Sequence, residues 1–253
     1  DKIVLGPKEF RIGRYAGGDI ALKYESGDFV FRTINGKRQI STVGELELIK
    51  KDLTALETYV QTADLTLVGI DNWTPIGSRF ATYKGYFYGQ GYRIYDISIV
   101  RDELGHDYLG LFGLIEGIIH GVHLVSGKLE VSVPTVGGIC GINYSNGIIS
   151  NCSNGAEIKN SHTGYIYPIQ DGYSSGICGY SFSQIYGCYN TGNIETTQHA
   201  GGITGKSLKN LIACYNTGTI RGDTVGGITA SAGNGMVYEA CYNTGEIYGR
   251  SIQ

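Results

Sequence analysis

The sequence predicts an all-β fold: a right-handed parallel β-helix of about seven coils, preceded by a capping α-helix and a small N-terminal β extension. The main observation is a repeat. A Gly-Ile pair followed by an Asn-containing corner recurs four times after residue 137, and Cys188, Cys214 and Cys241 of these corners are 26 and 27 residues apart. Short runs of Ile, Val, Tyr, Thr and Cys lie between the glycines, as expected of short strands joined by turns. A unit of about 26 residues has room for three such strands, which make one coil.

Residues 1–38 precede the repeats and carry strand signals of their own. Residues 20–24 and 29–34 have the composition of strands, and Asn35-Gly36 is a strong signal for a two-residue hairpin. We expect a small β extension here. The alternative is that these residues end a preceding domain, with the boundary near residue 38.

Residues 39–57 are predicted to contain an amphipathic helix. Ser41 or Thr42 stands at N-cap spacing before Glu45 or Glu47. Apolar residues then recur with a helical period, at Leu46, Ile49, Leu53 and Leu56. Such a helix would cover the open end of the first coil, which otherwise exposes a row of unpaired backbone groups.

The repeats are assigned to residues 58–253. Each cysteine of the corner set is followed six residues later by isoleucine, and only the step from Cys152 to Cys188 is longer, at 36 residues. Where a position keeps one residue type from coil to coil, we expect the equivalent side chains of successive coils to lie one above another. We therefore expect interior ladders of Cys and of Ile, the latter formed by Ile158, Ile194, Ile220 and Ile247. Degenerate copies such as Gly110-Leu111-Phe112-Gly113 extend the array upstream.

The six cysteines form two sets: Cys140 and Cys178 after the Gly-Ile pair, and Cys152, Cys188, Cys214 and Cys241 before the Asn corners. The chain has no CxxC pair and no His at ligand spacing, which argues against zinc. Disulfides between adjacent coils are an alternative, although aligned side chains point in parallel rather than toward each other. We interpret the cysteines as small buried residues that fill a narrow interior, and we predict no catalytic thiol.

We interpret the Asn-Thr-Gly sequences as turns before we consider a role in binding. Asn tolerates the left-handed region and Gly supplies positive φ, so we expect Asn190, Asn216 and Asn243 at corners. Outer ladders are expected beside them, of Thr191, Thr217 and Thr244 and of Tyr189, Tyr215 and Tyr242. The tyrosine ladder is a candidate for binding sugars or protein partners, with ordinary surface packing as the alternative. We do not expect an ice-binding surface, because three threonines beside bulky tyrosines do not form a flat array that could order water.

Two segments interrupt the repeat. Residues 100–108 hold a weak Ca²⁺ candidate without the Asp-x-Asp-x-Asp-Gly spacing of a dedicated calcium loop, formed by Asp102, Glu103 and Asp107. A solvated loop is the alternative. Residues 159–175 account for the longer step between cysteines, and aromatic residues on a long loop above a rigid scaffold commonly bind partners. We predict a ligand or partner contact there, through His162, Tyr165, Tyr167, Asp171 and Tyr173.

The composition is typical of a protein that is rich in turns and has a net charge close to zero. The chain has 40 Gly, 20 Tyr and a net charge of -3, whereas a nucleic-acid-binding protein needs a concentrated basic face. We expect no nucleic-acid partner and no membrane insertion, since no apolar stretch is long enough to span a bilayer. We found no signal-peptide pattern, and we interpret the start at Asp1 as that of a mature or trimmed chain with further domains on the same polypeptide.

The order of the motifs resembles that in the GLUG-motif proteins of bacterial cell surfaces. The resemblance covers roughly residues 39 to 250 and rests on Trp73-Thr74-Pro75-Ile76-Gly77, Phe87-x-Gly89-x-Gly91-Tyr92-x-Ile94, Gly110-Leu111-Phe112-Gly113 and the repeated Gly-Gly-Ile and Cys-Tyr-Asn-Thr-Gly. It implies a secreted or surface-anchored β-helical protein, of a kind that includes adhesins and flanking regions of larger proteins such as bacterial immunoglobulin A peptidases. The motif itself carries no catalytic residues, so the resemblance implies a location and a scaffold more than an activity.

We therefore predict a non-enzymatic, secreted or surface-displayed bacterial β-helix, without a cofactor, that acts as an adhesin or presents a neighbouring domain. Its partners would be host glycans or extracellular-matrix or cell-surface proteins. One alternative is a polysaccharide lyase or glycoside hydrolase, which would require carboxylates on adjacent coils to converge in one groove. The best such cluster in the sequence is His162, Asp171, His199, Lys206, Arg221 and Asp223. A passive stalk is the third possibility.

Overall fold

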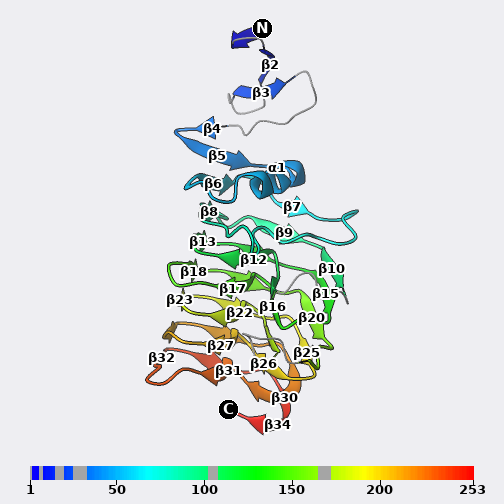
Figure 1. Cartoon of the computed structure of the whole chain (residues 1–253), viewed down its shortest axis with the longest axis vertical. Helices are drawn as coiled ribbons and strands as arrows, with labels where there is room; N and C mark the ends of the chain where they lie inside the picture. Colours follow the sequence, from blue (N-terminus) through cyan, green and yellow to red (C-terminus); the bar gives the residue numbers. More distant parts are fainter. Residues whose placement is uncertain (1, 6–7, 15–19, 25–32, 102–107, 165–171) are drawn as a thin grey trace.

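The computed structural model describes residues 2–5, 8–14, 20–24, 33–101, 108–164 and 172–253, with side chains from residue 33 onward. These residues form a long stack of β coils, with one short α-helix near its N-terminal end and the C-terminus at the other end (Figure 1). Among the described residues, no helix is long and apolar enough to cross a membrane.

The N-terminal strands include the predicted hairpin. Strands β1 (Lys2–Leu5), β2 (Lys8–Arg14) and β3 (Ile20–Tyr24) form an antiparallel sheet. Strands β4 (Thr33–Ile34) and β5 (Lys37–Ile40) pair through Asn35 and Gly36, which both have positive φ, at 50° and 73°. Strand β5 then pairs in parallel with β6 (Thr58–Gln61). The second strand of the hairpin thus belongs to the solenoid sheet, and the predicted boundary near residue 38 falls inside it.

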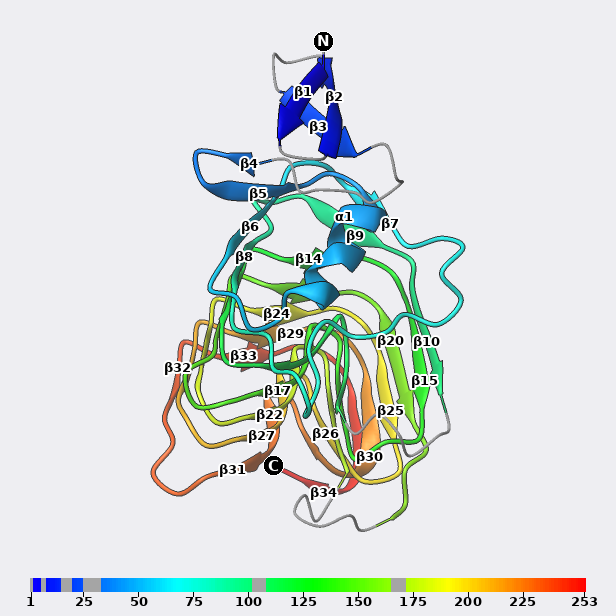
Figure 2. The same cartoon turned by 45° about the horizontal axis from the view of Figure 1, so that its top comes forward.

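The helix α1 (Val43–Leu48) continues into the 3₁₀ helix η1 (Ile49–Lys51) and lies across the first turn of the stack (Figure 2). Thr42 is its N-cap: the hydroxyl of Thr42 accepts a hydrogen bond from the Glu45 amide at 3.2 Å, and the Glu45 carboxylate accepts one from the Thr42 amide at 3.0 Å. Leu46 and Ile49 are fully buried. The prediction for Leu56 is wrong, since the helical turns end at Lys51 and this side chain is 70% exposed.

Four sheets, which we call I to IV, form the walls of the stack. Every strand pairing between coils is parallel, so successive coils add strands to the same four sheets. Sheet I contains β4, β5, β6, β8 (Tyr86–Tyr88), β13 (Ile118–His120), β18 (Ile148–Ser150), β23 (Gln184–Tyr186), β28 (Leu211–Ile212) and β32 (Tyr238–Glu239). Sheet II contains β7 (Leu65–Thr66), β9 (Arg93–Tyr95), β14 (His123–Leu124), β19 (Ser153–Asn154), β24 (Tyr189–Asn190), β29 (Tyr215–Asn216) and β33 (Tyr242–Asn243).

Sheets III and IV complete each coil. Sheet III has a first row of β10 (Ile97–Arg101), β15 (Gly127–Val131), β20 (Glu157–Asn160), β25 (Ile194–Thr196), β30 (Ile220–Gly226) and β34 (Ile247–Ile252). Its second row is β11 (Tyr108–Leu109), β16 (Thr135–Gly137), β21 (Tyr173–Ser175) and β26 (His199–Gly201), and the long β30 joins the two rows. Sheet IV contains β12 (Phe112–Ile115), β17 (Cys140–Asn143), β22 (Cys178–Ser181), β27 (Thr204–Ser207) and β31 (Thr229–Ala232).

The stack is a parallel β-solenoid of about six turns, one fewer than predicted. The difference lies at the start. The turn that begins at β6 places strands only in sheets I and II, and its other β pairings with the next coil are isolated bridges from Ile76 to Phe112 and from Tyr83 to Ile115.

The interior contains the predicted ladders. Ile158, Ile194, Ile220 and Ile247 are in register. All six cysteines are free thiols; five of them are buried and Cys241 is half-buried. A constant interior position in a stack of identical coils is therefore filled by the same small or branched apolar residue on every level.

The asparagines of the repeated corners differ from their predicted role, because they lie in strands of sheet II and point inward. Asn154, Asn190 and Asn216 are almost fully buried, and each amide nitrogen donates to the amide oxygen one coil further on, at 2.9, 2.7 and 2.7 Å, ending at Asn243. Each side chain also bonds the backbone carbonyl two residues ahead, as expected of Asn in a turn. The residues with positive φ are instead those directly before the cysteines: Asn151, Gly187, Ala213 and Ala240.

Glycines of the Gly-Ile pairs face this asparagine ladder across the interior. A Cβ atom on Gly202 would lie 2.5 Å from Cβ of Asn216, and Gly138, Gly176 and Gly227 stand in the same relation to Asn154, Asn190 and Asn243. Real Cβ atoms essentially never come that close. The two repeated motifs therefore occur together, because the glycine of the Gly-Ile pair leaves the space that the asparagine side chain of the corner motif occupies.

A candidate binding groove on the outer face

Sheet III carries a row of charged side chains on its outer face. Leu129, Ile158, Ile194 and Ile220 point inward, so the residue that follows each of them points outward. Strand register aligns these outward residues in one column, which consists of Glu130, Lys159, Glu195, Arg221 and Tyr248. Charge alternates along this column from one coil to the next.

Three hollows follow this column, and we call them together the sheet III groove. The first, of about 370 Å³, shares Glu130 and Lys159 with the second, of about 400 Å³. The second shares Glu195 and Arg221 with the third, of about 630 Å³. Because strands of neighbouring coils are roughly 4.8 Å apart, the six strands from β10 to β34 give the groove a length of about 24 Å.

Part of the charge in the groove has no ion-pair partner. Lys128 pairs with Glu130 at 3.0 Å, Arg250 pairs with Asp223 at 3.5 Å, and the Arg221 guanidinium lies 3.9 Å from the centre of the Tyr248 ring. In the part of the chain that the structure describes, no ion pair involves Glu157, Lys159 or Glu195. The middle of the groove thus presents two carboxylates and one ammonium group to solvent or to a ligand.

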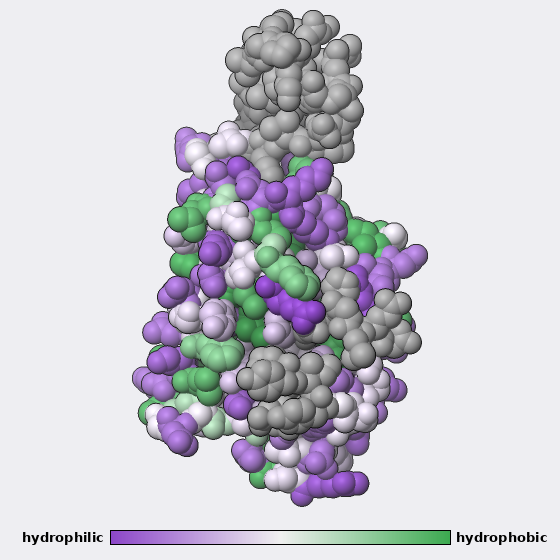
Figure 3. All heavy atoms as spheres, viewed as in Figure 1, coloured by the Kyte–Doolittle hydropathy of each residue, from purple (hydrophilic) through white to green (hydrophobic). Residues whose placement is uncertain are grey.

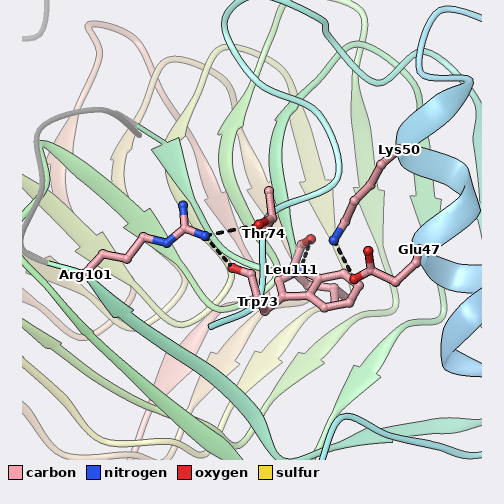
Figure 4. Close-up of polar contacts among 6 residues, drawn as sticks. All are labelled: Glu47, Lys50, Trp73, Thr74, Arg101 and Leu111. Atoms are coloured by element: carbon pink, nitrogen blue, oxygen red, sulfur yellow. Dashed lines mark hydrogen bonds and ion pairs between the residues drawn. The ribbon is translucent and has the colours of Figure 1, made fainter. Parts of the chain in front are cut away.

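The upper end of the groove is held in place by the first coil. Arg101 donates from Nε to Oδ1 of Asn72 at 3.0 Å. Its Nη2 donates to Oγ1 of Thr74 at 3.2 Å, as Figure 4 shows. The indole of Trp73 between them is fully buried and donates to the Leu111 carbonyl at 3.0 Å. These hydrogen bonds hold the guanidinium beside the first hollow, which Arg101 lines.

The same tryptophan joins the groove end to the cap. Nζ of Lys50 lies 3.7 Å from the centre of the Trp73 ring and pairs with Glu47 at 2.6 Å, on the side opposite Arg101 in Figure 4. Burial lowers the pKa of Lys50, although the Glu47 carboxylate opposes that effect. The cation-π contact and the ion pair hold the helical turns against the first coil.

Two of the predicted loop contacts are buried instead of exposed. Tyr173 is the first residue of β21, is only 3% exposed, and packs against Tyr180 and His199 with ring centres 5.6 and 5.2 Å away. His162 is 4% exposed, its Nε2 has no hydrogen-bond partner among the described residues, and burial lowers its pKa. Both rings are buried in this arrangement, and a ligand contact through these two residues stays a prediction.

Other predicted residues fall outside the described part of the chain. Tyr165, Tyr167 and Asp171 of the long loop lie there, as do the three residues of the weak calcium candidate, Asp102, Glu103 and Asp107. Among the residues that the structure does describe, no group of three or more His, Cys, Asp or Glu side chains could hold a metal ion.

The tyrosine ladder lies on the outer face of sheet II as predicted. The rings of Tyr189, Tyr215 and Tyr242 stack with centres 4.9 and 5.1 Å apart and planes within 2° and 3°. Each ring therefore covers the face of its neighbour, and mainly ring edges and hydroxyl groups point outward. Since sugars stack on the faces of aromatic rings, this ladder offers them less surface than its sequence suggests.

The described residues of the predicted catalytic cluster are divided between two places. Lys206 of β27 lies over the rings of Tyr173 and Tyr180, at 5.5 and 5.3 Å from their centres. Asp223 pairs with Arg250 at the lower end of the sheet III groove. Sequence reasoning missed the groove itself, although the signal was available: Glu130, Lys159, Glu195, Arg221 and Tyr248 each follow an aligned Leu or Ile.

A second, more apolar surface lies beside the groove face. Tyr180 stacks on Phe182 at 4.3 Å, and Tyr144 packs edge-on against Phe182 at 5.3 Å, both on or next to sheet IV. Hydrophobic side chains gather on the left of this face in Figure 3, between polar ones. A separate hollow of about 400 Å³ lies on sheet I and includes Tyr186, Leu208, Ile212 and Met236 in its lining.

Comparisons with known proteins identify the fold. No family model matches the chain, and no curated protein matches it. Among solved structures, the 1.30 Å crystal structure of a putative immunoglobulin A1 protease from Bacteroides ovatus superposes with a TM-score of 0.69. The match covers 89% of this chain and 87% of that one, at 19% identity.

This chain shares that β-solenoid fold. At 19% identity the likeness shows the fold alone. Immunoglobulin A peptidases are among the proteins that the GLUG resemblance implies, so this neighbour supports the resemblance loosely. Membership of that family stays a prediction.

Proposed function

We propose that the chain is a non-enzymatic binding scaffold, secreted or displayed at a bacterial surface, and that the sheet III groove holds its partner. One observation carries the proposal: three connected hollows run along the stack and include charged side chains, Glu157, Lys159 and Glu195, without ion-pair partners among the described residues. An open groove about 24 Å long suits an extended chain better than a compact small molecule, which usually binds in an enclosed pocket.

The scaffold is suited to binding because it is held rigid on every level. The middle strands of the groove, β15, β20, β25 and β30, are each paired on both sides in sheet III, and their inward residues are packed in the core. Side chains that are positioned before the ligand arrives lose little conformational freedom on binding. An adhesin role is consistent with this arrangement and with the GLUG resemblance.

The proposal is tested with an array of host glycans and extracellular-matrix proteins, probed with the labelled chain. A groove variant carries Glu157→Gln, Lys159→Gln and Glu195→Gln. A matched control carries Glu239→Gln on β32 of sheet I, an exposed glutamate outside the groove. We expect saturable binding that the groove variant loses and the control keeps. Absence of binding to every probe would contradict the proposal and leave a passive stalk.

A second candidate function is cleavage of a polysaccharide. Glu130, Glu157 and Glu195 come from three adjacent coils and line one hollow together with Lys128, Lys159 and Arg221. Convergence of carboxylates and cations is what acid-base cleavage of glycans requires. Release of reducing ends or unsaturated sugars from a soluble polysaccharide, abolished by Glu157→Gln or Glu195→Gln, would replace the binding proposal with this one. Binding without any product would support the scaffold.

A further inference from the structure

We infer that the sheet III groove takes an uncharged linear polysaccharide that lies along the stack axis. This inference rests on the proposed function of the same site and names the chemical class of its ligand. It draws on the balance of charge in the groove, on the hydrogen-bonding groups that line it, and on the pairing of its strands.

Charge in the groove is nearly balanced and finely mixed. The side chains that line the three hollows include five cations, Arg101, Lys128, Lys159, Arg221 and Arg250, and four anions, Glu130, Glu157, Glu195 and Asp223. Opposite charges alternate along the outer column and also along the column beside it, where Lys128 is in register with Glu157. A polyanion would place negative groups beside carboxylates as often as beside cations, and like charges brought together oppose binding.

Hydroxyl groups match this lining better. A sugar hydroxyl both donates and accepts hydrogen bonds, so it can donate to a carboxylate on one coil and accept from an ammonium or guanidinium group on the next. The second hollow adds Asn193 and Thr219 beside Glu195 and Arg221. Successive coils present outward side chains at intervals of roughly 4.8 Å, so a polymer of repeating units meets hydrogen-bonding groups at regular steps.

The lower end of the groove offers an aromatic surface. Tyr248 is 44% exposed and lines the third hollow, and its hydroxyl donates to Glu246 at 2.8 Å. This ring belongs to no stack of tyrosines, since its column neighbour is Arg221. The Arg221 guanidinium covers one face of the Tyr248 ring, and the rest of the ring is exposed to the third hollow, where it can contact the apolar side of a pyranose.

An extended peptide fits the groove less well. Peptides that bind sheets in extended form add a strand to an unpaired edge, through backbone hydrogen bonds. The middle strands of the groove, β15, β20, β25 and β30, are each paired on both sides and have no free edge. Recognition here has to use side chains alone, which favours a ligand that carries its polar groups on its own periphery.

The test is calorimetric titration of the whole chain with soluble polysaccharides. The uncharged probes are mixed-linkage β-glucan, arabinoxylan and glucomannan, and the polyanions are alginate and heparin. We expect binding of at least one uncharged probe, at least tenfold weaker in Glu157→Gln/Glu195→Gln and unchanged in Glu239→Gln. Because few counterions are released, affinity should change little between about 50 and 500 mM salt. Circular dichroism confirms that each variant is folded.

Two results would overturn the inference. One is groove-dependent binding of alginate or heparin alone, with affinity that falls steeply with salt. The other is groove-dependent binding of a matrix protein on the array while no uncharged polysaccharide binds. Both leave the proposed binding function standing. Failure of all polysaccharides and of every array probe would refute the proposed function as well, so the two failures are distinguishable.

Discussion

Replacing Asn216 with alanine tests how much the interior asparagine ladder stabilises the stack. Asn216 is fully buried and makes three hydrogen bonds: it accepts from Asn190 at 2.7 Å, and donates to Asn243 at 2.7 Å and to the Gly218 carbonyl at 2.8 Å. The Asn190 amide keeps its second bond, to the Gly192 carbonyl at 2.8 Å. The Gly218 carbonyl and the Asn243 amide oxygen lose a donor.

The expected cost follows from these bonds. A neutral hydrogen bond contributes about 1 kcal/mol net, and a buried partner left without a bond adds about 1 to 3 kcal/mol. We expect the free energy of unfolding to fall by about 3 to 4 kcal/mol for Asn216→Ala. The matched control is Asn243→Ala at the last rung. Its side chain is half-buried and joins only one other asparagine, so water can replace part of the loss and we expect about 1 kcal/mol.

Urea unfolding followed by circular dichroism measures both variants, and hydrogen exchange at β29 reports the local effect. The local measurement is needed because repeat arrays can unfold in parts, and a single midpoint then averages over coils. Equal losses in the two variants would refute the reasoning, since a bond in the middle of the ladder would then be worth no more than one at its end.

Three further predictions concern other parts of the chain. Ellman's reagent should modify only Cys241 in the native protein and all six thiols after denaturation, because the other five are buried and burial raises the pKa of Cys140 and Cys188. Rapid modification of two or more native thiols would contradict the packing. Burial, with a smaller effect of Arg93, lowers the pKa of His123 from 6.5, so its contribution to stability should be complete above pH 6.5 and lost as pH falls through the lowered value. Urea midpoints between about pH 5 and 8 should therefore converge for wild type and His123→Asn at the acid end; a constant difference would refute this. Thr42→Ala should cost about 1 kcal/mol in urea unfolding followed by the fluorescence of the single tryptophan, whereas Thr42→Ser should cost less, because serine keeps the cap.

The fold could be predicted because its constraints are periodic. A repeated Ile or Cys must stack on itself in a solenoid, and Ile158, Ile194, Ile220 and Ile247 do so. The inward direction of the asparagines could not be predicted in the same way. Side-chain parity is lost across a turn, and the residue with positive φ proved to be the one before each cysteine and not the asparagine.

The candidate site was harder to predict, for a different reason. The length of residues 159–175 drew attention to aromatic residues, but the length of a segment does not determine which side chains are exposed, and Tyr173 packs under its neighbours. The groove residues have no motif of their own. Lys159, Glu195 and Arg221 look like ordinary surface charges until register places them one above another. The predicted isoleucine ladder implied that their signs alternate, but only the structure shows that these charges line adjoining hollows.

The asparagine ladder also makes the length of the protein adjustable. Each inner rung, Asn190 and Asn216, donates to an asparagine ahead and accepts from one behind, so the surfaces exposed by removing one whole inner coil match each other. Duplication or deletion of a 26-residue segment in the gene would require no new interior chemistry. Each added coil would lengthen the outer groove by roughly 4.8 Å. If the groove binds a polymer as proposed, the number of coils would set the length of polymer that one chain can hold.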